Sequence, residues 1–94
     1  MALELARQGY RDYRISDSAT VRLLLAGPLS IGELGEVLGI TRQAARKVTR
    51  YLEDRGYATT AADSADGRKV NVVLTRTGRA YARTVVEVIA LLNR

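Results

Sequence analysis

The chain of 94 residues has the length of one small domain, which leaves room for a single modest core. Its 15 lysine and arginine residues outnumber its 10 acidic residues, and the net charge of +5 favours an anionic partner, most simply nucleic acid. The absence of cysteine and histidine excludes disulfides, thiolate metal sites and histidine-based catalysis, and no spacing of other side chains suggests an active site. We therefore predict a protein that is not an enzyme and that uses no metal or cofactor.

No apolar run in the chain reaches the length of a transmembrane helix, and the first residues carry Glu4 and lack the apolar stretch of a signal peptide. The cationic residues do not lie opposite a strongly hydrophobic exposed face, so a membrane surface fits less well than nucleic acid as the anionic partner. We expect a cytoplasmic protein that does not bind membranes.

Residues 2–14 predict a short first helix, with an apolar side formed by Ala2, Leu3, Ala6, Tyr10 and Tyr13. Gly9 weakens this helix by about 1 kcal/mol relative to alanine, so the helix needs packing partners. Two interpretations stay open for the segment: a frayed chain terminus, or a helix that braces the domain or takes part in dimerisation.

A second helix is predicted over residues 19–26, which are mostly apolar. The Ser-Asp-Ser sequence at residues 16–18 offers N-cap side chains directly before this helix. The Gly27-Pro28 pair ends it, because glycine can adopt a left-handed cap and proline cannot continue a helix.

Residues 30–55 have the pattern of a helix-turn-helix. A serine and a glutamate three residues apart form a capping box, which predicts a short helix over residues 31–38. Gly39 supplies a left-handed turn residue, and Thr41 caps the helix that follows. The small residue Gly35 lets the axes of the two helices approach closely.

The second helix of this pair, over residues 41–55, is amphipathic. Its polar arc is mostly cationic and contains no acidic residue before Glu53. The members of this arc are Arg42, Gln43, Arg46, Lys47 and Arg50. A solvated surface helix would show the same pattern, but the short helix and turn before it favour the recognition helix of a nucleic-acid-binding protein.

A β-hairpin with a basic tip is predicted directly after the helix-turn-helix. Residues 57–61 are rich in threonine, and residues 69–75 place valine and leucine on one strand face. The polar loop at residues 62–69 between them contains Asp66-Gly67, which is a strong turn signal. A hairpin in this position is a wing.

A last helix, over residues 77–93, is predicted to begin after a cap by Thr75 or Thr77. It is apolar on more than one side, and one small domain can hardly cover all of that surface, so we predict a subunit contact. The residues predicted for this dimerisation face are Tyr81, Val85, Val88, Ile89 and Leu92. The alternative is a helix that is buried within its own domain.

From Leu34 to Arg79 the chain resembles the MarR family of transcription regulators. The matching segments are LGEVLGITRQAARKVTRYLEDRGY and DGRKVNVVLTRTGR. The resemblance implies a winged helix-turn-helix that usually forms a homodimer on pseudo-palindromic DNA. The expected fold class is mainly α with a small β-hairpin (α+β), with about five helices and a two- to three-stranded wing sheet. We expect a single domain at 1–94, with an N-terminal bracing or dimerisation helix at 1–14, the helix-turn-helix at 30–55, the wing at 57–75 and a C-terminal dimerisation helix at 77–93.

The resemblance also implies which residues contact DNA. The residues expected in the major groove are Thr41, Arg42, Gln43, Arg46 and Lys47. Arg68 matches the wing arginine that enters the minor groove, and Asp66 braces the wing as a turn residue or arginine partner. Arg50 and Lys69 are interpreted either as phosphate contacts or as solvated charges. Independently of the family, arginine pairs with guanine edges and glutamine with adenine, and narrow minor grooves attract arginine.

The leading hypothesis is a sequence-specific double-stranded DNA-binding transcription regulator, acting as a homodimeric repressor. Two alternatives stay open: a winged-helix module that binds protein, and an architectural protein that binds DNA without sequence specificity. Members of the family usually carry longer terminal helices than this chain. The geometry of the dimer and the identity of any small-molecule effector are therefore left open.

Overall fold

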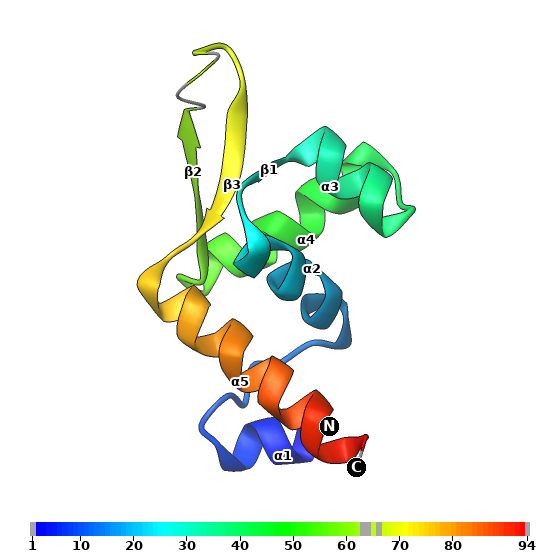
Figure 1. Ribbon diagram of the computed structural model, residues 1–94, viewed down its shortest axis with the longest axis vertical. Helices are drawn as coiled ribbons and strands as arrows, with labels where there is room; N and C mark the ends of the chain where they lie inside the picture. Colours follow the sequence, from blue (N-terminus) through cyan, green and yellow to red (C-terminus); the bar gives the residue numbers. More distant parts are fainter. Residues whose placement is uncertain (1, 63–64, 66, 94) are drawn as a thin grey trace.

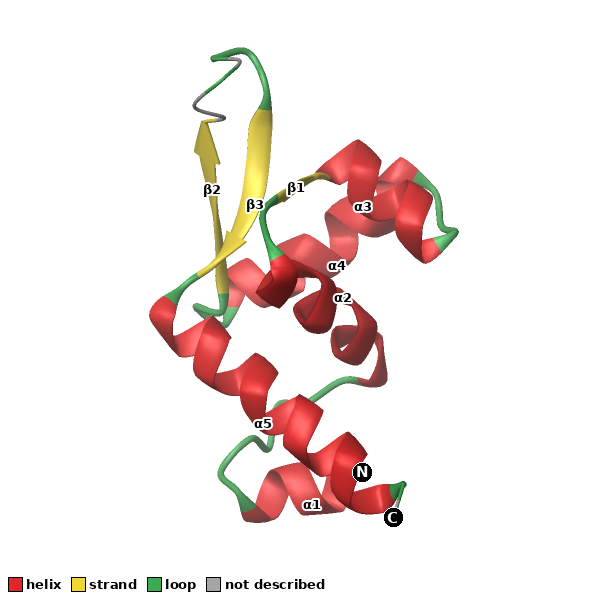
Figure 2. Cartoon of the chain, in the orientation of Figure 1, coloured by secondary structure: helices red, strands yellow, loops and turns green. Residues whose placement is uncertain are grey.

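The structure is a computed structural model that describes residues 2–62, 65 and 67–93. Within these residues, the helices and strands are α1 (Ala2–Arg7), α2 (Ile15–Ala26), β1 (Leu29–Ser30), α3 (Ile31–Leu38), α4 (Arg42–Asp54), β2 (Ala58–Ala62), β3 (Val70–Leu74) and α5 (Arg76–Leu92). The β2–β3 hairpin projects from one end of the molecule, and α1 lies beside the end of α5 at the other (Figure 1). The predicted fold class, mainly α with a small sheet, is confirmed (Figure 2).

The first helix is shorter than the predicted span of residues 2–14, because α1 ends at Arg7. Gly9 adopts the left-handed backbone conformation with a φ of 97°, and its amide donates to the carbonyl of Ala6 at 3.1 Å. This turn ends the helix, since a continuing helix would need a right-handed φ at the same position. Residues 8–14 therefore form turns and a loop that lead into α2.

The start of α2 also differs from the prediction, because the helix begins earlier, at Ile15. Its N-cap is Arg14, so the predicted N-cap role of residues 16–18 is wrong. Asp17 instead lies in the first turn, where its carboxylate accepts a hydrogen bond from the Arg14 amide at 3.1 Å. The helix ends before the Gly-Pro pair as predicted, but Gly27 is extended, with a φ of 161°, and does not adopt the predicted left-handed cap.

The predicted helix-turn-helix is confirmed. The hydroxyl of Ser30 accepts from the Glu33 amide at 3.1 Å, and the Glu33 carboxylate accepts from the Ser30 amide at 3.0 Å, which completes the capping box of α3. Gly39 makes the turn with a left-handed φ of 70°. Thr41 caps α4, because its hydroxyl accepts from the Ala44 amide at 3.0 Å.

Gly35 brings α3 and α4 into close contact. A Cβ atom at this position would lie 3.1 Å from the carbonyl oxygen of Ile40 and 3.7 Å from the Cβ of Ala45. A larger side chain would push the two helices apart, so the predicted need for a small residue is confirmed.

The sheet has three antiparallel strands in the order β1-β3-β2 within the described residues. The central strand β3 pairs Val72 with Leu29 on one side and with Thr60 on the other. Strand β1 has only two residues, too few to produce an alternating pattern in the sequence. Val72 and Leu74 are buried, whereas Val70 on the same strand face extends past the core and is exposed.

The core includes Tyr57 and Tyr81 as well as the aliphatic side chains of α2, α5 and the sheet, and Tyr10 is partly buried against it. The rings of Tyr57 and Tyr81 stack with their centroids 4.3 Å apart, and the ring of Tyr10 lies 4.9 Å from that of Tyr81. Tyr10 belongs to the loop after α1, and Leu5 of α1 is fully buried. The N-terminal segment is therefore packed on the core and is not a frayed end.

Candidate nucleic-acid interface

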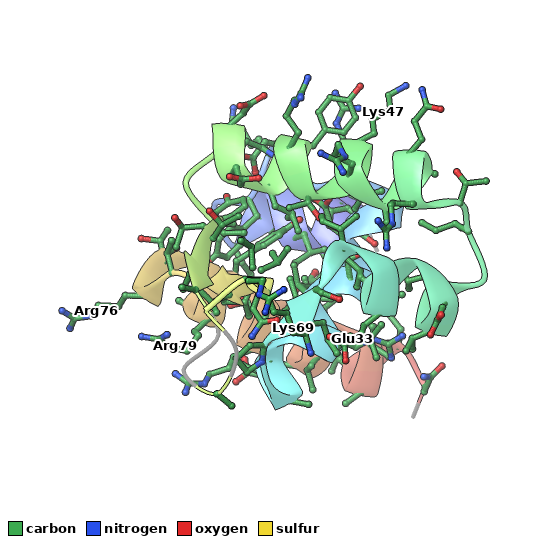
Figure 3. The ribbon with its side chains drawn as sticks, turned by 90° about the horizontal axis from the view of Figure 1, so that it is seen from above. Glu33, Lys47, Lys69, Arg76 and Arg79 are labelled. Carbon is green, nitrogen blue, oxygen red and sulfur yellow. The ribbon has the colours of Figure 1, made fainter. Side chains whose placement is uncertain are left out.

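The outward face of α4 carries the predicted polar arc. Ala45, Thr49 and Leu52 on the opposite face are buried, whereas the residues of the arc are exposed, and Lys47 points away from the body (Figure 3). The exposed residues of this arc, which we call the basic face, are Arg42, Gln43, Arg46, Lys47 and Arg50. Thr41, the cap of the helix, is exposed next to them. The basic face thus combines four cations with one amide, a suitable set for phosphates and base edges.

An ion pair missing from the predictions anchors the C-terminal end of α4. The guanidinium of Arg55 donates to both carboxylate oxygens of Asp17, at 2.8 and 2.9 Å, and to the backbone carbonyl of Asp12 at 2.7 Å. Asp17 is fully buried and also accepts from the Tyr81 hydroxyl at 2.8 Å. Because Asp17 belongs to α2 and Tyr81 to α5, this network fixes the orientation of α4 relative to both helices.

Both tyrosines next to this ion pair are held in the protonated form. Burial, followed by the hydrogen bond to Asp17, raises the pKa of Tyr81 far above its ordinary value. Burial, followed by the nearby carboxylate of Asp12, raises the pKa of Tyr57 to about 12. The two hydroxyl groups therefore remain hydrogen-bond donors to carboxylates at neutral pH.

The wing residues predicted to contact DNA have different surroundings. Arg68 is exposed near the tip of the hairpin, whereas Asp66, predicted to brace the wing, lies outside the described residues. The ammonium group of Lys69 is 3.0 Å from the Glu33 carboxylate, and the two residues lie side by side between the wing and α3 (Figure 3). Lys69 therefore connects the wing to α3 in this structure, and its contact with phosphate stays a prediction.

The Lys69–Glu33 pair also changes the acidity of the carboxylate. The pKa of Glu33 falls from 4.5 to about 2, first because of the hydrogen bond from the Ser30 amide and then because of Lys69. One carboxylate thus caps α3 and holds the wing strand beside it.

Residues 74–79, which lead from the wing into α5, pack against the end of α4 and the wing. Thr75 caps α5, as one of the two predicted alternatives, and its hydroxyl also donates to the carbonyl of Gly56 at 2.6 Å. A Cβ on Gly78 would lie 1.7 Å from the carbonyl oxygen of Tyr57, so only glycine fits there. Arg79 points away from the body but donates to the Leu74 carbonyl at 3.2 Å (Figure 3). The first turn of α5 is therefore fixed against the residues that follow α4.

The predicted dimerisation face is only partly available to a partner. Tyr81, Val85 and Val88 are fully buried in the core of this chain, which contradicts their predicted place in a subunit contact. Ile89 is partly buried against the same core, and only Leu92 is largely exposed.

Apolar side chains do remain exposed where α1 meets the end of α5: Leu3 (71%), Val86 (41%), Leu91 (49%) and Leu92 (55%). We call these four residues the apolar end.

Two other kinds of site were sought in the described part of the chain. No three side chains of histidine, cysteine, aspartate or glutamate in residues 2–62, 65 and 67–93 are grouped so that they could hold a metal ion. None of the helices in these residues combines the length and apolar character that a membrane crossing requires.

Several solved structures have the same fold as this chain. Streptococcus pneumoniae FabT in complex with DNA is 21% identical, with a TM-score of 0.78, and the match covers 88% of this chain and 59% of that chain. S. aureus MepR in complex with DNA is 20% identical, with a TM-score of 0.77 and coverage of 95% and 76%. A variant of Lactococcus lactis ZitR is 19% identical, with a TM-score of 0.72 and coverage of 78% and 50%. This chain therefore spans about half the length of ZitR.

Sequence comparison identifies the family. None of the curated proteins matches the chain. The family model described as MarR family matches residues 15–69, which is more than half of the 94 residues and includes α2, the helix-turn-helix and β2, the first strand of the wing hairpin. The chain belongs to the MarR family.

Proposed function

We propose that the protein is a sequence-specific double-stranded DNA-binding transcription regulator that acts as a homodimeric repressor. The observation that carries this proposal is the basic face of α4, which is exposed, has no acidic member and sits on the second helix of a helix-turn-helix. An α-helix fits the major groove of B-DNA, and the second helix of this motif is the one that enters it.

The chemistry of the basic face suits the reading of base edges. Arg46 and Lys47 lie in the middle of α4 and can donate to guanine, while Gln43 can pair with adenine through its amide. Arg68 on the wing would reach the adjacent minor groove, where negative potential is enhanced when the groove is narrow. Arg50, further along α4, is suited to a phosphate.

Family membership supports the same function. FabT and MepR, both similar in fold to this chain, were solved in complex with DNA. A protein that binds DNA would act in the cytoplasm, on the nucleoid. Any small-molecule effector remains to be found by experiment.

The apolar end supports a homodimer. It lies at the opposite end of the molecule from the tip of the wing, so a second copy bound there would leave both wings free for DNA (Figure 1). A two-fold contact of this kind uses the same residues on both subunits. If each subunit made about four phosphate contacts, log affinity would fall against log salt with a slope of about −7.

Selection from random duplex DNA at two salt concentrations tests the proposal. Enrichment of an inverted repeat with half-sites about one helical turn apart is the expected result. Salt-sensitive binding without an enriched sequence would indicate an architectural protein instead. No binding at low salt would indicate a module that binds protein.

A further inference from the structure

One member of the basic face lies differently from the rest. The guanidinium of Arg42, the first residue of α4, rests against the first turn of α3 at Gly32. A Cβ atom on Gly32 would lie 2.7 Å from Nη2 of Arg42 and 3.6 Å from its Cζ. The guanidinium therefore occupies the space that any other side chain at position 32 would take.

The backbone does not require a glycine at position 32. Gly32 is helical and is not among the described glycines with a left-handed φ, which are Gly9, Gly39 and Gly56. Glycine inside a helix is unfavourable relative to alanine, so helix stability does not explain this residue. What glycine provides here is room beside α3, because it has no side chain. That space is filled by the guanidinium of Arg42.

The donors of this guanidinium are available to a ligand. Within the described residues the side chain of Arg42 forms no hydrogen bond or ion pair, and it is exposed next to α3. Glu36 lines the same groove, but the described contacts contain no ion pair between its carboxylate and Arg42. An arginine with open donors suits a phosphate, which it can bind with two parallel hydrogen bonds.

The position of the guanidinium decides which part of DNA it would meet. In a helix-turn-helix the second helix enters the major groove, while the first helix crosses the sugar-phosphate backbone. Arg42 belongs to the second helix, but its charged group lies on the first helix. We propose that Arg42 contacts a backbone phosphate rather than a base edge, and that Gly32 is its positioning residue. This inference rests on the proposed DNA-binding function and revises the base contact expected for Arg42.

Binding measurements on the selected operator and on a scrambled duplex, at several salt concentrations, test this inference. Arg42→Gln should weaken binding to both duplexes by the same factor, and the salt slope should shrink by about 0.9 for each subunit. Gly32→Ala should cause a uniform loss of the same kind, since its methyl group displaces the guanidinium. The double variant should bind no more weakly than Arg42→Gln alone, because both changes act through one contact.

Two control variants separate this effect from general ones. Gly27→Ala adds a methyl group where no atom lies within 4 Å, and Arg83→Gln removes an exposed charge on α5, so neither should change DNA binding. The thermal midpoint of Gly32→Ala should equal or exceed that of the unmodified protein, because alanine favours the helix. A loss of binding in a variant of unchanged or higher stability cannot come from misfolding.

Three results would overturn the inference. Arg42→Gln could change the preferred bases, which would make Arg42 a base reader. Gly32→Ala could bind as tightly as the unmodified protein, or its loss could add in full to that of Arg42→Gln, and either result would remove Gly32 as the positioning residue. If the selection enriches no sequence, the proposed function fails, while the uniform loss in Arg42→Gln can still be measured on random duplex DNA.

Discussion

Helices α4 and α5 each bury one face in the same small domain, but the faces that they leave exposed differ in kind. The outer face of α4 is cationic from Arg42 to Arg50, so the helix has only one face that can enter a core. The second half of α5 is apolar on several sides and exposes Val86, Leu91 and Leu92 while burying Val85 and Val88. A charged face determines which side of a helix is buried. When a helix is apolar on all sides, its contacts with neighbouring residues determine which side is buried.

Two specific contacts determine which side of α5 is buried. The close packing of Gly78 on the carbonyl of Tyr57 sets the position of its first turn. One turn further on, the hydroxyl of Tyr81 donates to the buried carboxylate of Asp17. These two contacts turn Tyr81, Val85 and Val88 inward and leave the apolar end outside.

The largest effect is expected from placing a charge on each side of α5. Val88→Asp should cost more than about 4 kcal/mol of unfolding free energy, because it buries an unpaired carboxylate, and the protein should fail to fold. Leu92→Asp should leave the subunit folded but halve the mass seen in light scattering, because it places a charge in the proposed dimer contact. Circular dichroism checks the fold of both variants.

Two outcomes would contradict this description of α5. A folded Val88→Asp protein would mean that the inner face of α5 is not a core face. An unchanged mass of Leu92→Asp would exclude the apolar end as the dimer contact.

A smaller loss of stability is expected when α4 loses its C-terminal anchor. Arg55→Ala should lower the free energy of unfolding by about 3–5 kcal/mol, because the buried carboxylate of Asp17 loses its cation. Arg50→Ala is the matched control, since it removes an exposed arginine from the same helix and should change stability by less than about 0.5 kcal/mol. Urea denaturation measures both values. If Arg55→Ala lost as little stability as Arg50→Ala, the ion pair would not anchor α4.

Local signals and distant contacts explain which parts of this structure could be predicted. The capping box at Ser30, the turn at Gly39 and the cap at Thr41 depend on residues within one turn of each other, so the sequence alone predicts them. The Asp17–Arg55 pair joins residues 38 positions apart, and no spacing rule connects them. The local sequence favours Asp17 as an N-cap candidate. Its role in the network cannot be read from the local sequence, because it depends on the packing of α2, α4 and α5.

The basic face was predictable for the same local reason, since its members recur at helical spacing within α4. The position of the Arg42 guanidinium could not be predicted, because it depends on the absence of a side chain at Gly32, which lies on another helix. The buried face of α5 was predicted as a dimer contact because counting apolar residues does not reveal which of them the chain itself covers. Residue pattern alone thus predicts exposure well where the exposed side chains are charged.

An intermediate effect is expected on DNA binding when the basic face loses one base contact. Arg46→Ala should weaken binding to the selected operator by about 1–3 kcal/mol and relax the preference at one base pair of each half-site. Arg83→Ala, an exposed arginine of α5, should leave affinity and preference unchanged. Fluorescence anisotropy with a set of single-base operator variants gives both quantities, and unchanged values for Arg46→Ala would remove this residue from the interface.

The smallest effect is expected at the connection between the wing and α3, and it depends on pH. The pKa of Glu33 is about 2 in the folded protein against 4.5 ordinarily, so its carboxylate contributes stability above pH 4.5 and loses that contribution as the pH falls toward 2. Glu33→Gln should flatten the decline of the thermal midpoint across this range, whereas Glu87→Gln on α5 should leave the decline as it is. Because Glu33 both caps α3 and pairs with Lys69, the variant Lys69→Gln separates the two roles. It should remove only part of the pH dependence, and the remainder belongs to the hydrogen bond from Ser30, which is the larger cause of the lowered pKa.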